Sequence, residues 1–507
     1  MKYLLGIDLG TSGTKTVLFT QEGKPVASAT IEYPMIQPQN GWAEQHPDDW
    51  WKAARDTVSQ VMKESGINSE EIAGIGISGQ MHGLVMLDIN GKVLRPAILW
   101  CDGRTTEECK EITETIGKQR LIEINANPAL PGFTAGKILW VRKHEPEIWA
   151  QCAQIMLPKD YVRYKLTGVY ATEVSDASGT NLLDVTNRCW SHEILEKLNI
   201  DKSILPKMYE SCDVTGYVTE EAANVTGLNK GTIVVGGAGD NAAAAIGTGI
   251  VKSGRAFISI GTSGVIFAHS DKVTIDPAGR VHTFCAAVPG AWTVMSCTLA
   301  AGLSLKWYRD NFCEAEIRKA EAENVDPYYL MDKEAEKIPI GANRLIYLPY
   351  LMGERSPILD ENSRGVFFGL SAIHGRYDML RAVMEGVVYS QLNCLEVLGE
   401  MKCHLQEIIA TGGGGSSPLW RQMLADTFGF PVKTSINKEG PVLGVALLAG
   451  VGAGIYSSVE EACERVIKIN PAQQPDMENN KKYKKVYEIY KGLYGQLKQS
   501  FSKLSEL

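Results

Sequence analysis

The sequence predicts two related α/β domains around a central cleft. One observation is the stretch 6–15, Gly-Ile-Asp-Leu-Gly-Thr-Ser-Gly-Thr-Lys, in which a Gly/Thr/Ser turn separates two apolar, strand-like runs. The other is its echo at 257–267, where Gly-Thr-Ser-Gly again stands between two apolar runs. A repeat at such long range indicates two domains built on the same hairpin.

Both hairpin turns have the composition of a phosphate-binding loop. Glycine has no Cβ, so backbone N–H groups in such a turn can approach a phosphate closely. An ordinary Gly-rich hairpin is the alternative for either copy alone, and neither copy is a P-loop, which needs a lysine beside Ser or Thr. Two hairpins that grip one polyphosphate are the arrangement of the actin-like (ribonuclease H-like) ATPase domains. The residues expected at the phosphates are Gly10, Thr11, Ser12, Lys15, Gly261, Thr262 and Ser263.

Composition limits the class of protein. The chain has 507 residues, which predicts two to four domains, and its hydrophobic share of 44% is typical of a globular protein. A net charge of −8 argues against a nucleic-acid partner. The 11 cysteines show no metal-like spacing, and they predict free thiols in a reducing, cytoplasmic setting. No signal peptide precedes the first strand, and we expect no membrane partner; a homodimer is left open.

The remaining segments follow from apolar patterning. The run 440–454 is too short for a membrane span and rich in Gly and Ala, so we expect a buried helix. Expected strands are 72–78, 84–87, 97–100, 233–235 and 408–411; expected helices are 48–63, 106–124, 137–149, 242–247 and 419–428.

The repeat suggests a domain boundary near residue 245. We expect a first domain at 1–245, a second domain at 246–490 and a helical tail at 491–507; the family resemblance given below implies that the first binds a sugar and the second a nucleotide. The segment 481–504 carries aromatic residues at helical spacing. A membrane-surface helix is one interpretation, and packing of this helix on the body is the commoner one.

Two aspartates are candidate catalytic residues. Asp8 ends the first strand, where it would face a magnesium ion that accompanies the phosphates, held through water. Asp240 stands on a Gly-rich turn between a strand and an Ala-rich helix. It could cap that helix, or act as general base toward a bound hydroxyl. Asn241 could cap equally well, which leaves both roles open.

A second group of residues could bind a polyol. Met81 and His82 follow a strand end, where α/β sheets bind ligands, and glycines flank them. A lone histidine is more often structural. Trp100, at another strand end, could form an apolar wall of the same pocket. Far downstream, a helix follows the run 412–415, and its N-terminus could face a nucleotide; a plain Gly-rich loop is the alternative.

Along nearly its whole length the chain resembles the FGGY carbohydrate kinases. One family signature matches 132–144, Gly-Phe-Thr-Ala-Gly-Lys-Ile-Leu-Trp-Val-Arg-Lys-His, and the other matches 365–370 with 378–385. Within the family, Gly-Gln-Met-His-Gly at 79–83 is most similar to the members that phosphorylate D-xylulose. Cys101 stands where those members often carry Asn.

The resemblance implies ATP-dependent phosphorylation of D-xylulose with Mg²⁺. It implies Asp240 as base, Asp8 near the metal, and Met81, His82, Trp100, Asp240 and Asn241 at the sugar. It also implies that Gly413, Gly414 and Ser416 contact the adenosine. Two alternatives remain open: a family member acting on ribulose, gluconate or glycerol, and a non-kinase actin-like ATPase.

Overall fold

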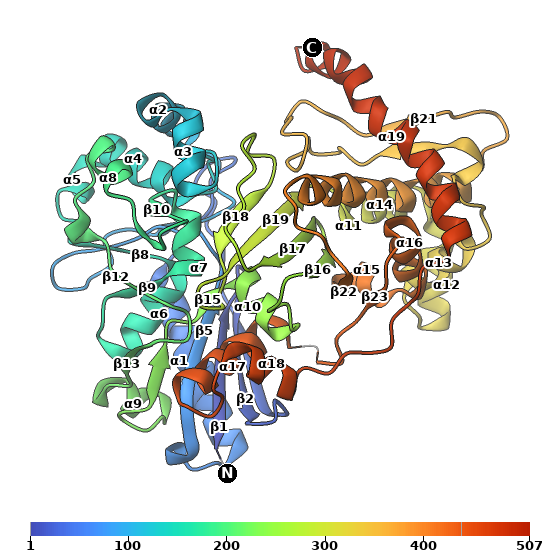
Figure 1. The fold of residues 1–507 in the computed structure, drawn as a ribbon. Helices are drawn as coiled ribbons and strands as arrows, with labels where there is room; N and C mark the ends of the chain where they lie inside the picture. Colours follow the sequence, from blue (N-terminus) through green and yellow to red (C-terminus); the bar gives the residue numbers. More distant parts are fainter. Residues whose placement is uncertain (1, 438, 507) are drawn as a thin grey trace.

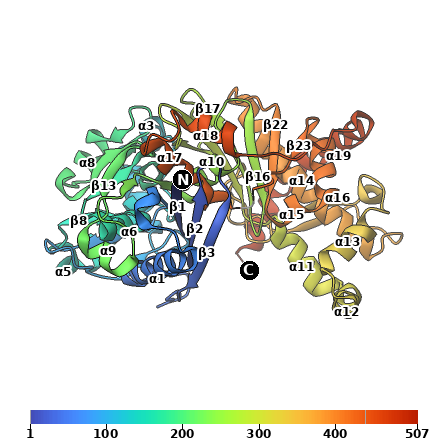
Figure 2. The ribbon, with the colours of Figure 1, turned by 90° about the horizontal axis from the view of Figure 1, so that it is seen from below.

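The computed structural model describes residues 2–437 and 439–506, which form two lobes, each built on a twisted sheet (Figure 1). The view from below separates the lobes along the horizontal direction (Figure 2). The two-lobed α/β fold predicted from the repeated hairpin is confirmed. No helix within the described residues is long and apolar enough to cross a bilayer.

The first sheet contains the N-terminal hairpin. β1 pairs antiparallel with β2 and parallel with β5, so β5 and the hairpin turn reach the same edge of the sheet. Its strands in spatial order are β13 (Val214–Tyr217), β14 (Ile233–Val235), β5 (Ile72–Gly79), β1 (Tyr3–Leu9), β2 (Gly13–Thr20) and β3 (Pro25–Glu32), and β15 (Ala238–Gly239) also pairs with β5.

Helices and short strand pairs complete the first lobe. The helices are α1 (Pro47–Ser65), α2 (Thr106–Ile116), α3 (Lys118–Asn125), α4 (Thr134–His144), α5 (Pro146–Trp149), α6 (Pro158–Thr167), α7 (Val174–Ala177), α8 (His192–Lys197), α9 (Glu220–Thr226) and α10 (Asp240–Gly247). The strand pairs are β4 (Glu44–Gln45) with β7 (Ala97–Ile98), β6 (Val85–Leu87) with β8 (Gln154–Met156), β9 (Ala171–Glu173) with β12 (Lys207–Tyr209), and β10 (Leu183–Asp184) with β11 (Cys189–Trp190).

The second sheet repeats the first. β16 pairs antiparallel with β17 and parallel with β22, as β1 does with β2 and β5. Its strands in spatial order are β18 (His282–Cys285), β19 (Trp292–Thr298), β17 (Gly264–Ser270), β16 (Arg255–Ile260), β22 (Glu407–Thr411) and β23 (Val432–Lys433). Its other elements are α11 (Gly302–Phe312), α12 (Glu314–Glu323), α13 (Pro327–Ala335), the pair β20 (Ile346–Leu348) and β21 (Val366–Phe368), α14 (Arg376–Glu400), α15 (Gly412–Ser416) and α16 (Pro418–Phe428).

Helix α17 (Gly440–Gly452) is the buried apolar helix expected from the sequence. It packs on α10, β1 and β5, so this late segment lies against the first sheet, as Figure 1 shows. Glycines make the close contact possible: a Cβ on Gly76 would lie 2.0 Å from the Val445 carbonyl oxygen, and one on Gly444 1.9 Å from that of Ala243. α18 (Val459–Val466) follows beside it.

The tail is one long helix, α19 (Met477–Leu504), which packs on α14 and α16. Its buried residues include Tyr483, Tyr487 and Tyr490, which confirms packing on the body for this helix. The expected boundary at 490/491 falls inside α19, and the one at 245/246 falls inside α10. Neither expected boundary lies between two elements, and the division of the chain into three parts remains a prediction.

Two expected helices have the wrong bounds, and the plain loop considered as an alternative for 412–415 is wrong. The helix expected at 106–124 is two helices, because Gly117 between them has φ +93°. The helix expected at 137–149 begins at Thr134 and is interrupted before Pro146, whose ring prevents an unbroken helix. The Gly-rich loop after β22 is not open: residues Gly412–Ser416 form the short helix α15.

Candidate active site

Two carboxylates, Asp8 and Asp240, lie at one edge of the first sheet. Asp8 of β1 pairs with Ser78 of parallel β5, and the Ser78 hydroxyl donates to Asp8 Oδ1 at 2.5 Å. β15 pairs with the same end of β5 through Gly239 and Gly79, and Asp240 comes next, at the start of α10. The structure therefore brings together the two residues that the sequence analysis selected as catalytic.

The environment of Asp240 suits proton transfer. Burial first, and then the nearby Asp8 charge, raise its pKa to about 7. Its Oδ1 accepts hydrogen bonds from the Asn241 backbone N–H and Nδ2 at 2.6 and 2.9 Å, which favour the ionised form. Gly239, not Asp240, occupies the N-cap position of α10, so the helix-cap interpretation is wrong. A carboxylate with a pKa near neutrality is well matched to general-base work.

His82 lies after β5 in a constrained conformation. Its φ of +69° is rare for a residue with a Cβ, and its Nδ1 lies 2.8 Å from the Gly179 carbonyl oxygen. Because a carbonyl only accepts, Nδ1 carries the proton and Nε2 is left as an acceptor. Burial, and then the charge of Lys137, lower the His82 pKa to about 3. A neutral imidazole of fixed tautomer can accept a hydrogen bond from a hydroxyl group.

The backbone of His82 is fixed by residues of α4. Lys137 Nζ donates to the His82 and Gly132 carbonyl oxygens at 2.8 and 2.6 Å, and Thr134 Oγ1 donates to the His82 oxygen at 3.1 Å. Phe133 packs on the imidazole with ring centroids 4.6 Å apart. Burial lowers the pKa of Lys137 to about 7. This set therefore maintains the strained histidine in one orientation.

Met81 and Trp100 differ in burial and in the groups that they contact. Met81 is buried, and its side chain covers Gly239: a Cβ on that glycine would meet Met81 Cγ at 2.8 Å. Trp100 is 44% exposed, and its indole N–H donates to Thr11 Oγ1 at 3.1 Å. Met81 therefore supports the turn before Asp240, while Trp100 presents a ring face beside the first hairpin turn.

Hydrogen bonds and an ion pair hold the first hairpin turn in place. Gly10 N–H donates to the Gly13 oxygen at 3.0 Å, and Gln45 Nε2 donates to the Thr11 oxygen at 2.7 Å. Ser12 is exposed at the tip. Lys15 forms an ion pair with Glu439, at the N-cap of α17, so its ammonium group is already engaged.

Half of the predicted nucleotide residues, five of ten, line one cavity of about 550 Å³ in the second lobe. Ser263 is not part of its lining, nor is any residue of the first hairpin turn. Trp420, Tyr328 and Leu303 supply apolar walls large enough for an adenine ring. The predicted residues that line the cavity are Gly261, Thr262, Gly413, Gly414 and Ser416.

Comparison with known proteins identifies the fold and the arrangement of both lobes. The N-terminal domain of the FGGY family of carbohydrate kinases matches residues 3–247, and the C-terminal domain of the same family matches residues 256–453. The chain belongs to this family.

One sequence relative and two solved structures show how similar this chain is to individual members of the FGGY family. The xylulose kinase of Bacillus subtilis is 42% identical over 97% of this chain and 97% of its own length. The crystal structure of ligand-bound xylulose kinase from Lactobacillus acidophilus superimposes with a TM-score of 0.92 at 28% identity, covering 99% of this chain and 100% of that one. A structure of gluconate kinase from Lactobacillus acidophilus gives the same TM-score and identity, covering 99% of each chain. Backbone shape alone therefore does not separate these substrates.

Several residues around the FGGY site were not selected from the sequence. Ser78 and Thr134 act through hydrogen bonds that only the register and the α4 packing reveal. Lys137 lay inside a family signature, which was a usable signal. In the cavity of the second lobe, Asp332 accepts a hydrogen bond from Ser417 at 2.6 Å, and burial raises its pKa to about 6. Nothing in the local pattern around Asp332 marks it.

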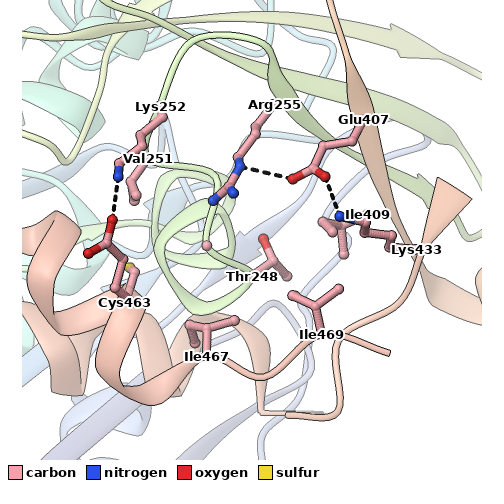
Figure 3. Close-up of a pocket in the computed structure, with 12 residues that line it drawn as sticks. Thr248, Val251, Lys252, Arg255, Glu407, Ile409, Lys433, Cys463, Ile467 and Ile469 are labelled. Atoms are coloured by element: carbon pink, nitrogen blue, oxygen red, sulfur yellow. Dashed lines mark hydrogen bonds and ion pairs between the residues drawn. The ribbon is translucent and has the colours of Figure 1, made fainter. Parts of the chain in front are cut away.

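A second cavity of this FGGY chain lies between the connection after α10 and the segment after α18 (Figure 3). Its volume is about 210 Å³, and none of the predicted site residues lines it. Arg255 and Lys433 both pair with Glu407, and Lys252 pairs with Glu464. These ion pairs link the strands of the second sheet to each other and α18 to the connection between the lobes.

Proposed function

We propose that this protein transfers the γ-phosphoryl group of ATP to D-xylulose and forms D-xylulose 5-phosphate. The substrate rests on the full-length similarity to the xylulose kinase of Bacillus subtilis, at 42% identity. The reaction type rests on one observation in the structure. A carboxylate, Asp240, has a pKa raised to about 7 and lies beside a second carboxylate at the sheet edge.

The first lobe binds the sugar in this proposal. Asp240 accepts the proton of the terminal 5-hydroxyl as that oxygen attacks the γ-phosphorus. His82 Nε2 accepts a hydrogen bond from another hydroxyl, and Trp100 covers the apolar side of the sugar. Asn241 donates to Asp240 and keeps one carboxylate oxygen engaged, so that the other faces the substrate. Met81 supports the turn beneath them.

The second lobe binds the nucleotide. The adenosine occupies the 550 Å³ cavity between Gly414 and Tyr328, and its phosphates extend toward the Gly261–Ser263 turn. The tip of the first hairpin, with Thr11 and Ser12, approaches the γ-phosphate from the other side. Backbone N–H groups of both turns then stabilise the charge on the transferring group.

Asp8 fits a magnesium ion that arrives with ATP. Its carboxylate is partly exposed, and among the described residues only the Ser78 hydroxyl hydrogen-bonds to it. A single carboxylate with several waters is a common way for proteins to bind Mg²⁺. When bound, the ion neutralises charge on the phosphates. No group of three or more His, Cys, Asp or Glu in the described chain forms a dedicated metal site.

A panel of phosphate acceptors tests the proposal. ADP release with Mg-ATP is measured for D-xylulose, D-ribulose, gluconate and glycerol at matched concentrations. D-xylulose should give the highest kcat/KM. Gluconate is the most informative competitor, because the gluconate kinase structure matches this fold as well as the xylulose kinase structure does. A clearly higher kcat/KM for any other acceptor would reject D-xylulose as the substrate.

A further inference from the structure

The segment that carries Arg355 is attached directly to the second phosphate hairpin. Both the Arg355 and the Leu299 backbone N–H groups donate to Glu354 Oε1 at 2.8 Å. Ser356 N–H donates to the Cys297 carbonyl oxygen at 3.1 Å. Cys297 and Leu299 flank the end of β19, which pairs with β17 immediately after the Gly261–Ser263 turn. The backbone of Arg355 therefore lies next to a turn that faces phosphate in the proposed function.

The guanidinium group of Arg355 lies close enough to both lobes for its charge to act on groups in each. Its positive charge contributes to the lowered pKa values of His82 and His282, which come from different lobes. His82 follows β5, and His282 begins β18. Phe133 packs between the two imidazoles, with centroids 4.6 and 5.8 Å from theirs. Arg355 thus has its backbone beside the phosphate turn and its charge within reach of the aromatic group around His82.

Within the described residues this guanidinium differs from other cations in the region: its charge opposes the rise that burial causes in the pKa of Glu354 beside it, but it forms no ion pair with that carboxylate. The part of the chain that the structure describes offers it no hydrogen bond or ion pair, and the side chain is partly exposed. Lys15 pairs with Glu439, Lys137 donates to two carbonyl oxygens, and Lys159 is buried among carboxylates. A charged donor set held at a cleft without a protein acceptor is suited to a ligand anion.

We propose that Arg355 is a catalytic residue that binds the oxygens of the transferred phosphoryl group, in the transition state and in the sugar phosphate product. The proposal rests on the proposed function. A neutral sugar offers no charge to an arginine, whereas the phosphoryl group carries charge throughout its transfer. The planar fork of donors matches two phosphoryl oxygens at once, and this is the geometry that lysine lacks. Arg355 would therefore act from the second lobe on a group that the first lobe receives.

Arg355→Gln and Arg355→Lys test the role, with Arg364→Gln as a matched control. Arg364 lies on the same segment, is exposed, and donates to the carbonyl oxygens of Glu361 and Ser363. We expect kcat to fall about 10²-fold or more for Arg355→Gln, the size seen when one charge-stabilising donor is lost. KM for the sugar should change little, and Arg355→Lys should recover only part of kcat. Arg364→Gln should behave as the unaltered enzyme.

Binding of the product gives a readout that a structural role would not move. Calorimetry should show weaker binding of D-xylulose 5-phosphate to Arg355→Gln, with D-xylulose binding and melting temperature unchanged. An unchanged kcat, or an effect confined to KM for the sugar, would overturn the proposal. So would a kcat loss fully explained by a lowered melting temperature. If the unaltered enzyme prefers another acceptor, the substrate assignment fails, and the same comparison with that acceptor and its phosphate still decides the role of Arg355.

Discussion

The two lobes share a backbone plan and differ in the chemistry placed on it. The order β3–β2–β1–β5 in the first sheet repeats as β19–β17–β16–β22 in the second, with the same parallel and antiparallel pairings. When the Gly-Thr-Ser-Gly turns are aligned, Asp8 corresponds to Ser259. The segment after β5 carries Met81 and His82, whereas the segment after β22 is the Gly-rich helix α15. The comparison teaches that the same backbone plan carries different side chains at equivalent positions, and in the proposed function one position serves the sugar and the other the nucleotide.

The largest effect should come from Asp240, the proposed proton acceptor in the first lobe. Asp240→Asn keeps the size of the side chain and an acceptor for the Asn241 N–H, but it cannot take a proton. We expect kcat to fall about 10²-fold or more, with sugar and ATP still bound. Steady-state kinetics together with binding calorimetry measure this. A nearly normal kcat would remove Asp240 from the mechanism.

Asp8 and Ser259 form a matched pair that tests the specialisation directly. Asp8→Asn should lower kcat at least about 10-fold and weaken the dependence on Mg²⁺, because it removes the charge expected to face the ion. Ser259→Ala at the equivalent place should change kcat by less than about 3-fold. Activity is titrated against Mg²⁺ for both variants. Equal losses in the two would contradict the division between the lobes.

The binding roles of the two equivalent segments can be separated by KM. Gly413 has open space around it, with no atom closer than 4.0 Å to an added Cβ, so Gly413→Val should fill the nucleotide cavity without disturbing α15. We expect KM for ATP to rise about 10-fold and KM for the sugar to stay. His82→Asn, which tolerates positive φ, should do the reverse. Parallel rises in both constants for either variant would mean that the segments are not specialised.

The smallest effect is a shift of the pH profile. Since Asp240 must be ionised to accept a proton, and its pKa is about 7, kcat/KM should fall as the pH drops below about 7. Asn241→Ala removes the Nδ2 donor that favours the ionised form, so the acid limb should move to higher pH by up to about one unit. A limb that moves to lower pH, or is absent, would show that Asp240 does not set the profile.

The sequence predicted the parts of the fold that repeat or that carry a short motif. The duplicated hairpin, the buried helix α17 and the choice of Asp8 and Asp240 all follow from local patterns, whereas the meeting of the two carboxylates follows from strand pairing. The breaks at Gly117 and Pro146 were missed although both residue types signal them, because apolar spacing on either side continued. The packing of α17 against the first sheet was not predicted, because it joins segments that are far apart in the sequence. The surroundings of Lys137, Asp332 and Arg355 are set by tertiary contacts, which the spacing of apolar residues in the sequence does not predict.

A crystal structure of Asp240→Asn with D-xylulose and a non-hydrolysable ATP analogue tests the central claim most directly. The account predicts the sugar in the first lobe, with its 5-hydroxyl within about 3.2 Å of the residue 240 side chain. It predicts the adenosine in the second lobe, between Gly414 and Tyr328. A sugar whose 5-hydroxyl lies beyond hydrogen-bond reach of residue 240, or a nucleotide bound in the first lobe, would contradict the account.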